Sequence, residues 1–235
     1  MNNRRWSTKR KIIIYLAVPV ILLISLVVTG CAPTRLYSVN MNYDSEKAVI
    51  PAYLKADEKG RAVKISIAEL MDIRQADDQM VIGRVVEKDG AKTPVLPKYI
   101  KPTQAVAAGI KEYLAKAGYK TSRDVGKWDL KEATIPETDS KLILGGSIEE
   151  LDISCWLGFP TDTYKARIKY SLVLADAAKK RILYRTSVES NTSLEYFSFS
   201  EERLEKQINV ALGEAIEKLF DDRKLAQKLK EAINE

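Results

Sequence analysis

The chain has 235 residues, of which 38 are Lys or Arg, 32 are Asp or Glu and none is His. Five of the basic residues lie within the first eleven positions, so from residue 31 onward 33 basic residues face 32 acidic ones and the net charge is +1. Without a clustered basic excess, nucleic acid is not expected as a partner. The lack of histidine removes the commonest general base and the usual zinc ligand, so neither a metal nor a cofactor is expected.

The N-terminus has the pattern of an export signal. Its basic residues precede an apolar run over residues 12–28, which contains Pro19. As a helix this run would span about 25 Å at roughly 1.5 Å per residue, which is short of a hydrocarbon core of about 30 Å. A cleaved signal over residues 1–30 is therefore favoured over an uncleaved transmembrane helix.

The segment Val28-Thr29-Gly30-Cys31 resembles the lipobox of bacterial lipoproteins. The resemblance implies that the Cys31 thiol receives diacylglycerol, that the signal is cleaved before it, and that the new N-terminus is acylated, typically with palmitate. Several acyl chains give a stable membrane anchor. Ala32, in place of Asp, implies delivery to the outer membrane with the protein facing the periplasm.

The segment after Cys31 is mixed and polar. Residues 31–60 are predicted to form a tether, with a short strand near residues 48–54. Alternation over residues 63–67 predicts a strand with one buried face, and a second short strand is predicted over residues 80–86. The Gly- and Pro-rich residues 88–102 are predicted to form a loop.

The period then becomes helical. An apolar stripe over residues 103–117 predicts an amphipathic helix that stops at Gly118. Residues 119–140 give no clear prediction. Residues 142–153 predict a strand whose apolar parity changes, so a bulge is expected near Glu149 and Glu150.

The second half predicts an antiparallel meander followed by helices. Residues 163–174 and 182–190 alternate strictly around a turn at 177–180. Ser198 or Ser200 is expected to cap a long helix whose stripe slips near Asp221-Asp222, which predicts a break and a separate last helix. The predicted fold class is therefore α+β, a two-layer domain over residues 61–235 with a mostly antiparallel sheet and two amphipathic helices on one face.

The chain contains three short motifs, Asp72-Ile73-Arg74, Ile82-Gly83 and Ala117-Gly118-Tyr119. They resemble those of the YajG-type bacterial lipoproteins and, more loosely, of auxiliary lipoproteins of ABC-type lipid transport systems. The resemblance implies an accessory protein without known catalysis and carries over to Asp72, Arg74 and Gly83. From their spacing, Asp72 and Arg74 share a face at a strand end, where they pair with each other or with charges of a partner.

Catalysis has one candidate. Glu149, Glu150 and Asp152 could supply the acid and base of a cell-wall glycan hydrolase, although the solvated face of a bulged strand is the favoured explanation. Cys155 has no histidine to activate it. The protein is therefore not expected to be an enzyme.

Two loops carry aromatic and apolar residues without a periodic reason for burial. In a meander both loops lie at the same end of the sheet, where they could form a patch that binds a partner or lipid, or could cover the core. The candidate residues are Trp156, Leu157, Phe159, Tyr196, Phe197 and Phe199. The expected function is a membrane-anchored, non-enzymatic accessory or docking component of an envelope complex, with a lipid-binding transport auxiliary as the alternative.

Overall fold

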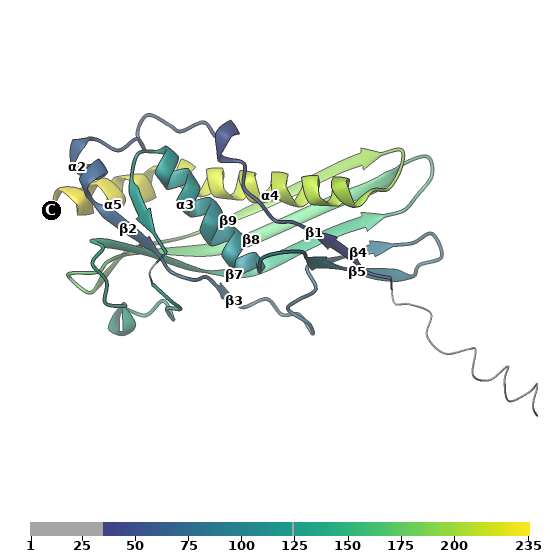
Figure 1. The fold of residues 1–235 in the computed structure, drawn as a ribbon, viewed down its shortest axis with the longest axis horizontal. Helices are drawn as coiled ribbons and strands as arrows, with labels where there is room; N and C mark the ends of the chain where they lie inside the picture. Colours follow the sequence, from purple (N-terminus) through teal and green to yellow (C-terminus); the bar gives the residue numbers. More distant parts are fainter. Residues whose placement is uncertain (1–34, 124) are drawn as a thin grey trace, which may run out of the picture. The chain divides into compact units, whose positions relative to one another are not determined.

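The computed structural model of the protein describes residues 35–123 and 125–235 (Figure 1). The predictions for the export signal and for Cys31 concern residues outside the described ones. Residues Leu36–Glu235 form one compact unit. Among the helices that the structure describes, none is long and apolar enough to cross a membrane.

Three long strands form the framework of the sheet. They are β7 (Leu142–Trp156), β8 (Asp162–Asp176) and β9 (Arg181–Tyr196), paired antiparallel in chain order. The register shifts between Ile148 and Glu150, where the change of apolar parity predicts a bulge. The predicted meander and its bulge are therefore confirmed.

Short strands occupy the other edge of β7. Three of them, β2 (Lys64–Ile67), β3 (Met71–Asp72) and β4 (Gly83–Val86), pair with β7 in parallel, one after another along its length. Outside them, β6 (Lys120–Ser122) pairs with β2, β5 (Lys92–Pro97) pairs with β4, and β1 (Tyr37–Val39) pairs with β5. The prediction of a loop throughout residues 88–102 is wrong, because β5 lies within it.

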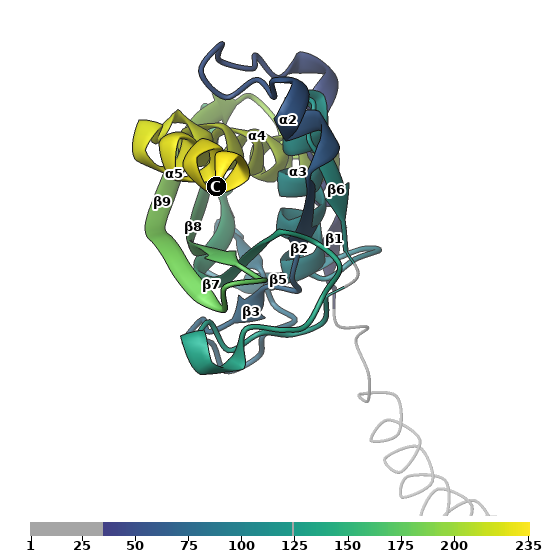
Figure 2. The same ribbon diagram turned by 90° about the vertical axis from the view of Figure 1, so that its left-hand side faces the viewer.

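The helices lie on one side of the sheet, as Figures 1 and 2 show. They are α2 (Glu58–Ala62), α3 (Pro102–Lys116), α4 (Glu201–Asp221) and α5 (Arg223–Asn234), with a short 3-10 helix at Ser45–Lys47. A second 3-10 helix, Glu132–Thr134, lies on the opposite side of the sheet. Ser200 caps α4 by accepting from the Arg203 amide, and Asp222 caps α5. The predicted break between the last two helices is confirmed, as is the α+β fold class.

The folded domain begins earlier than predicted. Val39 and Met41 are buried in the main core, and backbone amides of this segment donate to side chains of α4, such as Asn40 to Glu205 at 2.8 Å. Residues 48–54 contain turns and no strand. The prediction that residues 31–60 are a tether is therefore wrong from residue 36 onward, because the alternating apolar side chains of this segment fill the space beside α4.

Aromatic and aliphatic side chains fill the layer between the helices and the sheet. Tyr113 stacks on Phe220 with ring centroids 5.0 Å apart, and the buried Tyr170 hydroxyl donates to the Ala215 carbonyl at 3.1 Å. Burial of Tyr170 raises its pKa. A second cluster, centred on Trp128, packs on Ile143 and Val173. The region 119–140, for which no clear prediction was possible, thus covers the start of β7.

Candidate functional site

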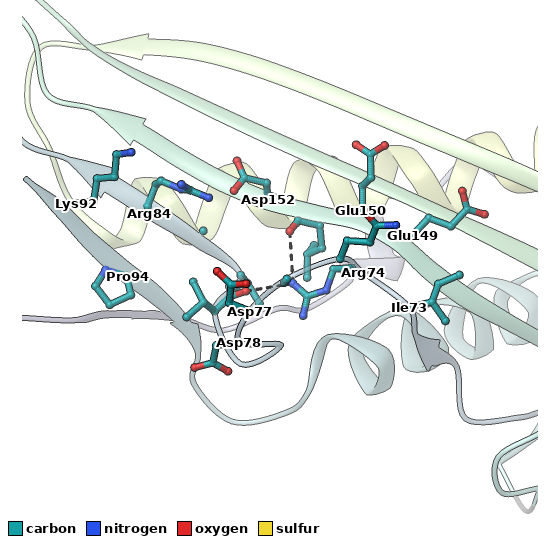
Figure 3. Close-up of a pocket in the computed structure, with 16 residues that line it drawn as sticks. Ile73, Arg74, Asp77, Asp78, Arg84, Lys92, Pro94, Glu149, Glu150 and Asp152 are labelled. Atoms are coloured by element: carbon teal, nitrogen blue, oxygen red, sulfur yellow. Dashed lines mark hydrogen bonds between the residues drawn. The ribbon is translucent and has the colours of Figure 1, made fainter. Parts of the chain in front are cut away.

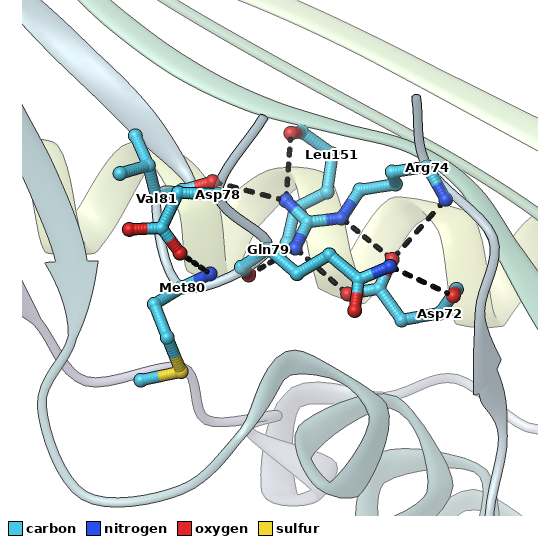
Figure 4. Close-up of polar contacts among 7 residues, drawn as sticks. All are labelled: Asp72, Arg74, Asp78, Gln79, Met80, Val81 and Leu151. Carbon is cyan, nitrogen blue, oxygen red and sulfur yellow. Dashed lines mark hydrogen bonds and ion pairs between the residues drawn. The ribbon is translucent and has the colours of Figure 1, made fainter. Parts of the chain in front are cut away.

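Arg74 forms a buried charged centre beside the bulge of β7 (Figure 4). Its Nη2 and Nε atoms donate to the two carboxylate oxygens of Asp72 at 2.8 and 2.9 Å. The same guanidinium donates to the carbonyls of Gln79 at 2.5 Å and Val81 at 3.2 Å. The predicted pair between Asp72 and Arg74 is confirmed, and its planar, bidentate geometry is one that arginine satisfies and lysine does not.

The loop between β3 and β4 takes its shape from this centre. Arg74 fixes two of its carbonyls, and the Gln79 side chain donates back to the Asp72 carbonyl at 3.3 Å. Asp78 accepts from the Met80 amide at 2.7 Å. The loop consequently stands as a defined wall beside the sheet, and two acidic side chains, Asp77 and Asp78, line the hollow next to it (Figure 3).

A groove runs from this loop across the open face of the sheet. Its first part has a volume of about 840 Å³ and its second part about 710 Å³, and both are lined by Arg84, Lys92, Glu150 and Asp152. The second part ends at Trp156, whose ring lies 5.2 Å from Lys165 Nζ. We call the two parts together the sheet groove. Most of the residues that line it have charged or polar side chains, and the charges are of both signs.

The three predicted carboxylates lie along one wall of the sheet groove (Figure 3). Glu149 pairs with Lys169 at 2.9 Å and Glu150 with Arg167 at 3.1 Å, while Asp152 accepts from the Ser154 hydroxyl. The hydrogen bond to Glu149 raises the pKa of Lys169. Cross-strand ion pairs of this kind explain the acidic residues without catalysis.

Gly83 allows β4 to approach β7 closely. A Cβ atom at this position would lie 1.7 Å from the carbonyl oxygen of Ile153, its partner across the ladder. Any side chain would therefore force the two strands apart. Gly83 thus has a structural part in the floor of the sheet groove, where it is also a lining residue.

The two aromatic loops lie at the same end of the sheet, as the meander predicts. Asp162, after the first loop, is directly opposite Tyr196, which precedes the second. The Thr161 hydroxyl also donates to Glu195 at 3.2 Å and links the two segments. We call this end of the molecule the aromatic end.

The six candidate residues do not form one patch. Trp156 pairs with Thr163, whereas Tyr196 pairs with Asp162, so the two rings lie on opposite faces of the sheet. Leu157, Tyr196 and Phe199 pack on the core, and Phe199 stacks beside Tyr164. The side chains of Phe159 and Phe197 are 94% and 87% exposed. The prediction of a single surface is wrong because it ignored strand parity.

Substitutions at Phe197 and Phe199 should distinguish a ring on the surface from a ring that packs on the core. Phe197→Ala removes an exposed ring and should leave the melting temperature unchanged. Phe199→Ala removes a ring that packs on Tyr37 and Tyr164, and should cost about 2 kcal/mol, below the range for a fully buried Phe. Thermal denaturation should show a drop of about 4–8 °C for this variant alone. Equal midpoints would contradict the assignment.

Cys155 is a buried thiol at the end of β7. Burial raises its pKa to about 12, so almost none of it is thiolate near neutral pH. A Cys31→Ser chain, in which Cys155 is the remaining thiol, should therefore resist a thiol-reactive dye at pH 8 and should react with it after unfolding in urea. Because the raised pKa suppresses the reactive form, reactivity should rise only at strongly alkaline pH. Rapid labelling of the folded variant at pH 8 would show that the site is open.

Comparison with known proteins finds the fold but no family. No family model and no curated protein matches the chain. Among solved structures, protein XCC0632 from Xanthomonas campestris, of family DUF330, is similar over 84% of this chain and 99% of its own, with a TM-score of 0.51 and 10% identity. Lipoprotein GNA1162 from Neisseria meningitidis matches 68% of this chain and 99% of its own, with a TM-score of 0.38 and 10% identity.

The likeness to XCC0632, at 10% identity, shows a shared fold and nothing further. The likeness to YajG-type lipoproteins remains a prediction from the motifs. In the structure, the motif residues have structural roles: Asp72 and Arg74 fix the conformation of the loop between β3 and β4, and Gly83 allows β4 to pack closely on β7.

Proposed function

We propose that this chain is a lipoprotein anchored through Cys31 at the periplasmic face of the outer membrane, and that its folded domain is a non-enzymatic docking component of an envelope complex. The observation that carries the docking role is the sheet groove, a long polar hollow held open by the buried Arg74. Its length along β7 and its charges of both signs suit an extended segment of a partner protein.

The packing of the interior favours docking over lipid carriage. A carrier needs an apolar cavity of several hundred cubic ångströms, whereas side chains such as Tyr113, Tyr170 and Phe220 fill the layer between the helices and the sheet. A further cavity of about 750 Å³ lies outside that layer, between Tyr53 and α5. A lipid-binding auxiliary of a transport system therefore remains the second proposal. Such a protein would contact lipid at its surface and not in the layer between the helices and the sheet.

The ion pairs in the sheet groove favour binding over hydrolysis. A glycosidase needs one carboxyl group that holds a proton and a second that acts as nucleophile or base. Glu149 and Glu150 instead form ion pairs with Lys169 and Arg167 of the neighbouring strand, at 2.9 and 3.1 Å, which explain both carboxylates as part of the sheet surface.

Site-specific photo-crosslinking tests the docking role. The crosslinking residue is placed in the full, lipidated chain at Gln75 or Ser193, exposed positions in the two parts of the sheet groove. Lys206, exposed on α4, is the matched control. Mass spectrometry of membranes after irradiation should find the same envelope protein attached at both groove positions and not at Lys206. Attachment to glycan fragments, or the same products at all three positions, would contradict the proposal.

A further inference from the structure

Two phenylalanines at the aromatic end are exposed without an intramolecular reason. Phe159 and Phe197 lie at the tips of the loops after β7 and β9 and are 94% and 87% exposed. Phe220, by contrast, is 1% exposed. Two such rings, in segments linked through Thr161 and Glu195, are expected to have an external contact.

The N-terminal segment leaves the fold at this same end. In β1, Tyr37 is level with Val95 of β5, and the chain before Tyr37 runs toward Lys92. Lys92 pairs with Val86, which in turn is level with Trp156 at the end of β7. Figure 1 shows β1, β4 and β5 at the end where β7 and β9 finish. The ring of Phe199 also lies 4.9 Å from that of Tyr37.

The length of the connection limits where a membrane can lie. Five residues lead from Cys31 to Leu36, and even fully extended they span at most about 17 Å. This step rests on the proposed lipid attachment at Cys31. An anchored domain is then held close to the bilayer surface, with the aromatic end nearest to it.

We propose that Phe159 and Phe197 insert into the interface of the same bilayer that holds the lipid anchor. Aromatic rings and basic side chains are favoured at that depth. The aromatic end carries both, since Arg203 at the start of α4 lies 4.7 Å from the ring of Tyr196 and Lys165 of β8 lies 5.2 Å from that of Trp156. The opposite end of the meander, at residues 178–180, exposes Lys179 and Lys180 and carries no exposed ring in that turn. The domain thus stands on its aromatic end, and the sheet groove runs from that end toward the middle of β7.

Tryptophan quenching by brominated lipid tests this orientation. Once the signal, with Trp6, is removed, the chain keeps Trp128, which is buried beside Gly145 near the start of β7, and Trp156. Trp156→Phe therefore leaves Trp128 as a reporter of the far end. Adding Phe159→Trp or Phe197→Trp to that variant places a second reporter at a loop tip. The lipidated full chains are incorporated into vesicles of phosphatidylethanolamine and phosphatidylglycerol, with or without brominated acyl chains.

The expected result is that tryptophan at position 159 or 197 loses most of its emission in brominated vesicles, while Trp128 alone keeps its emission. Equal melting temperatures establish that the variants are folded. If the proteins float with the vesicles but neither loop reporter is quenched, the aromatic end faces a partner protein and the inference is overturned. If the proteins do not float with the vesicles at all, the lipid anchor fails and the inference fails with it.

Discussion

Ile216→Asp should lower the free energy of unfolding by about 4 kcal/mol or more, because it puts an unpaired charge in the core. Ile216 is fully buried on α4, and its Cδ1 atom would lie 2.3 Å from a Cβ atom added at Gly109 of α3. The substitution therefore also separates two helices that pack closely. Urea denaturation measures the loss, and the variant is expected to be largely unfolded under conditions in which the native chain is folded.

The matched control lies two residues further along α4. Lys218 is exposed and forms only a surface pair with Glu214 at 3.7 Å, so Lys218→Ala should change stability little. Glu217, the outward position by sequence periodicity, is a poorer control because it accepts from the Tyr43 hydroxyl at 3.4 Å. If Ile216→Asp and Lys218→Ala unfold at the same urea concentration, α4 does not cover the sheet.

Arg74→Ala should cost about 3–5 kcal/mol, since it leaves Asp72 without its partner in a largely buried site. It also removes the donor to the carbonyls of Gln79 and Val81, so the loop between β3 and β4 should become sensitive to limited proteolysis. Arg74→Lys should recover only part of the stability, because an ammonium cannot form the bidentate pair.

Arg84→Ala is the control for charge loss in the same groove. Arg84 lines both parts of the sheet groove but is exposed, and its removal should leave stability and protease resistance nearly unchanged. The two readouts, equilibrium denaturation and proteolysis of residues 75–82, should therefore separate the variants. Native stability and an intact loop in Arg74→Ala would contradict its role in shaping the groove.

The elements with strong periodicity were predictable from sequence. Alternation in residues 163–174 defines β8, and the parity change at Glu149 marks the bulge. The slip of the apolar stripe likewise marks the helix cap at Asp222. Each of these signals is local, so one stretch of chain contains all the information needed.

Other elements were missed for identifiable reasons. Tyr37, Val39 and Met41 alternate with polar residues, but the run is short and follows the signal closely. Pro94 and Pro97 argue against a strand in β5, although proline is tolerated where its missing amide is not needed by the ladder. The parallel attachment of three short strands to one edge of β7 depends on contacts distant in sequence, which periodicity does not encode.

The candidate site likewise contains some features that local sequence predicts and others that it does not. The pair between Asp72 and Arg74 was predicted from their spacing, because residues two apart in an extended chain share a face, and Arg74 follows just after the end of β3. The carbonyls of Gln79 and Val81 that complete the centre come from a loop whose course no local pattern specifies. Strand parity, counted outward from Tyr164, would have separated Trp156 from Tyr196.

Membrane fractionation of a Cys31→Ser variant tests the central claim of lipid anchorage most directly. The variant is exported behind a signal that is cleaved without lipid attachment, so that the two chains differ only in the anchor. The two exposed phenylalanines could contribute at most about 3–6 kcal/mol of membrane binding, which is marginal without the covalent lipid. The account predicts that the variant is released in soluble form with an unchanged melting temperature, while the native chain stays with the membrane. Retention of the variant with the membrane fraction would contradict it and show that the folded domain binds the membrane or a membrane protein by itself.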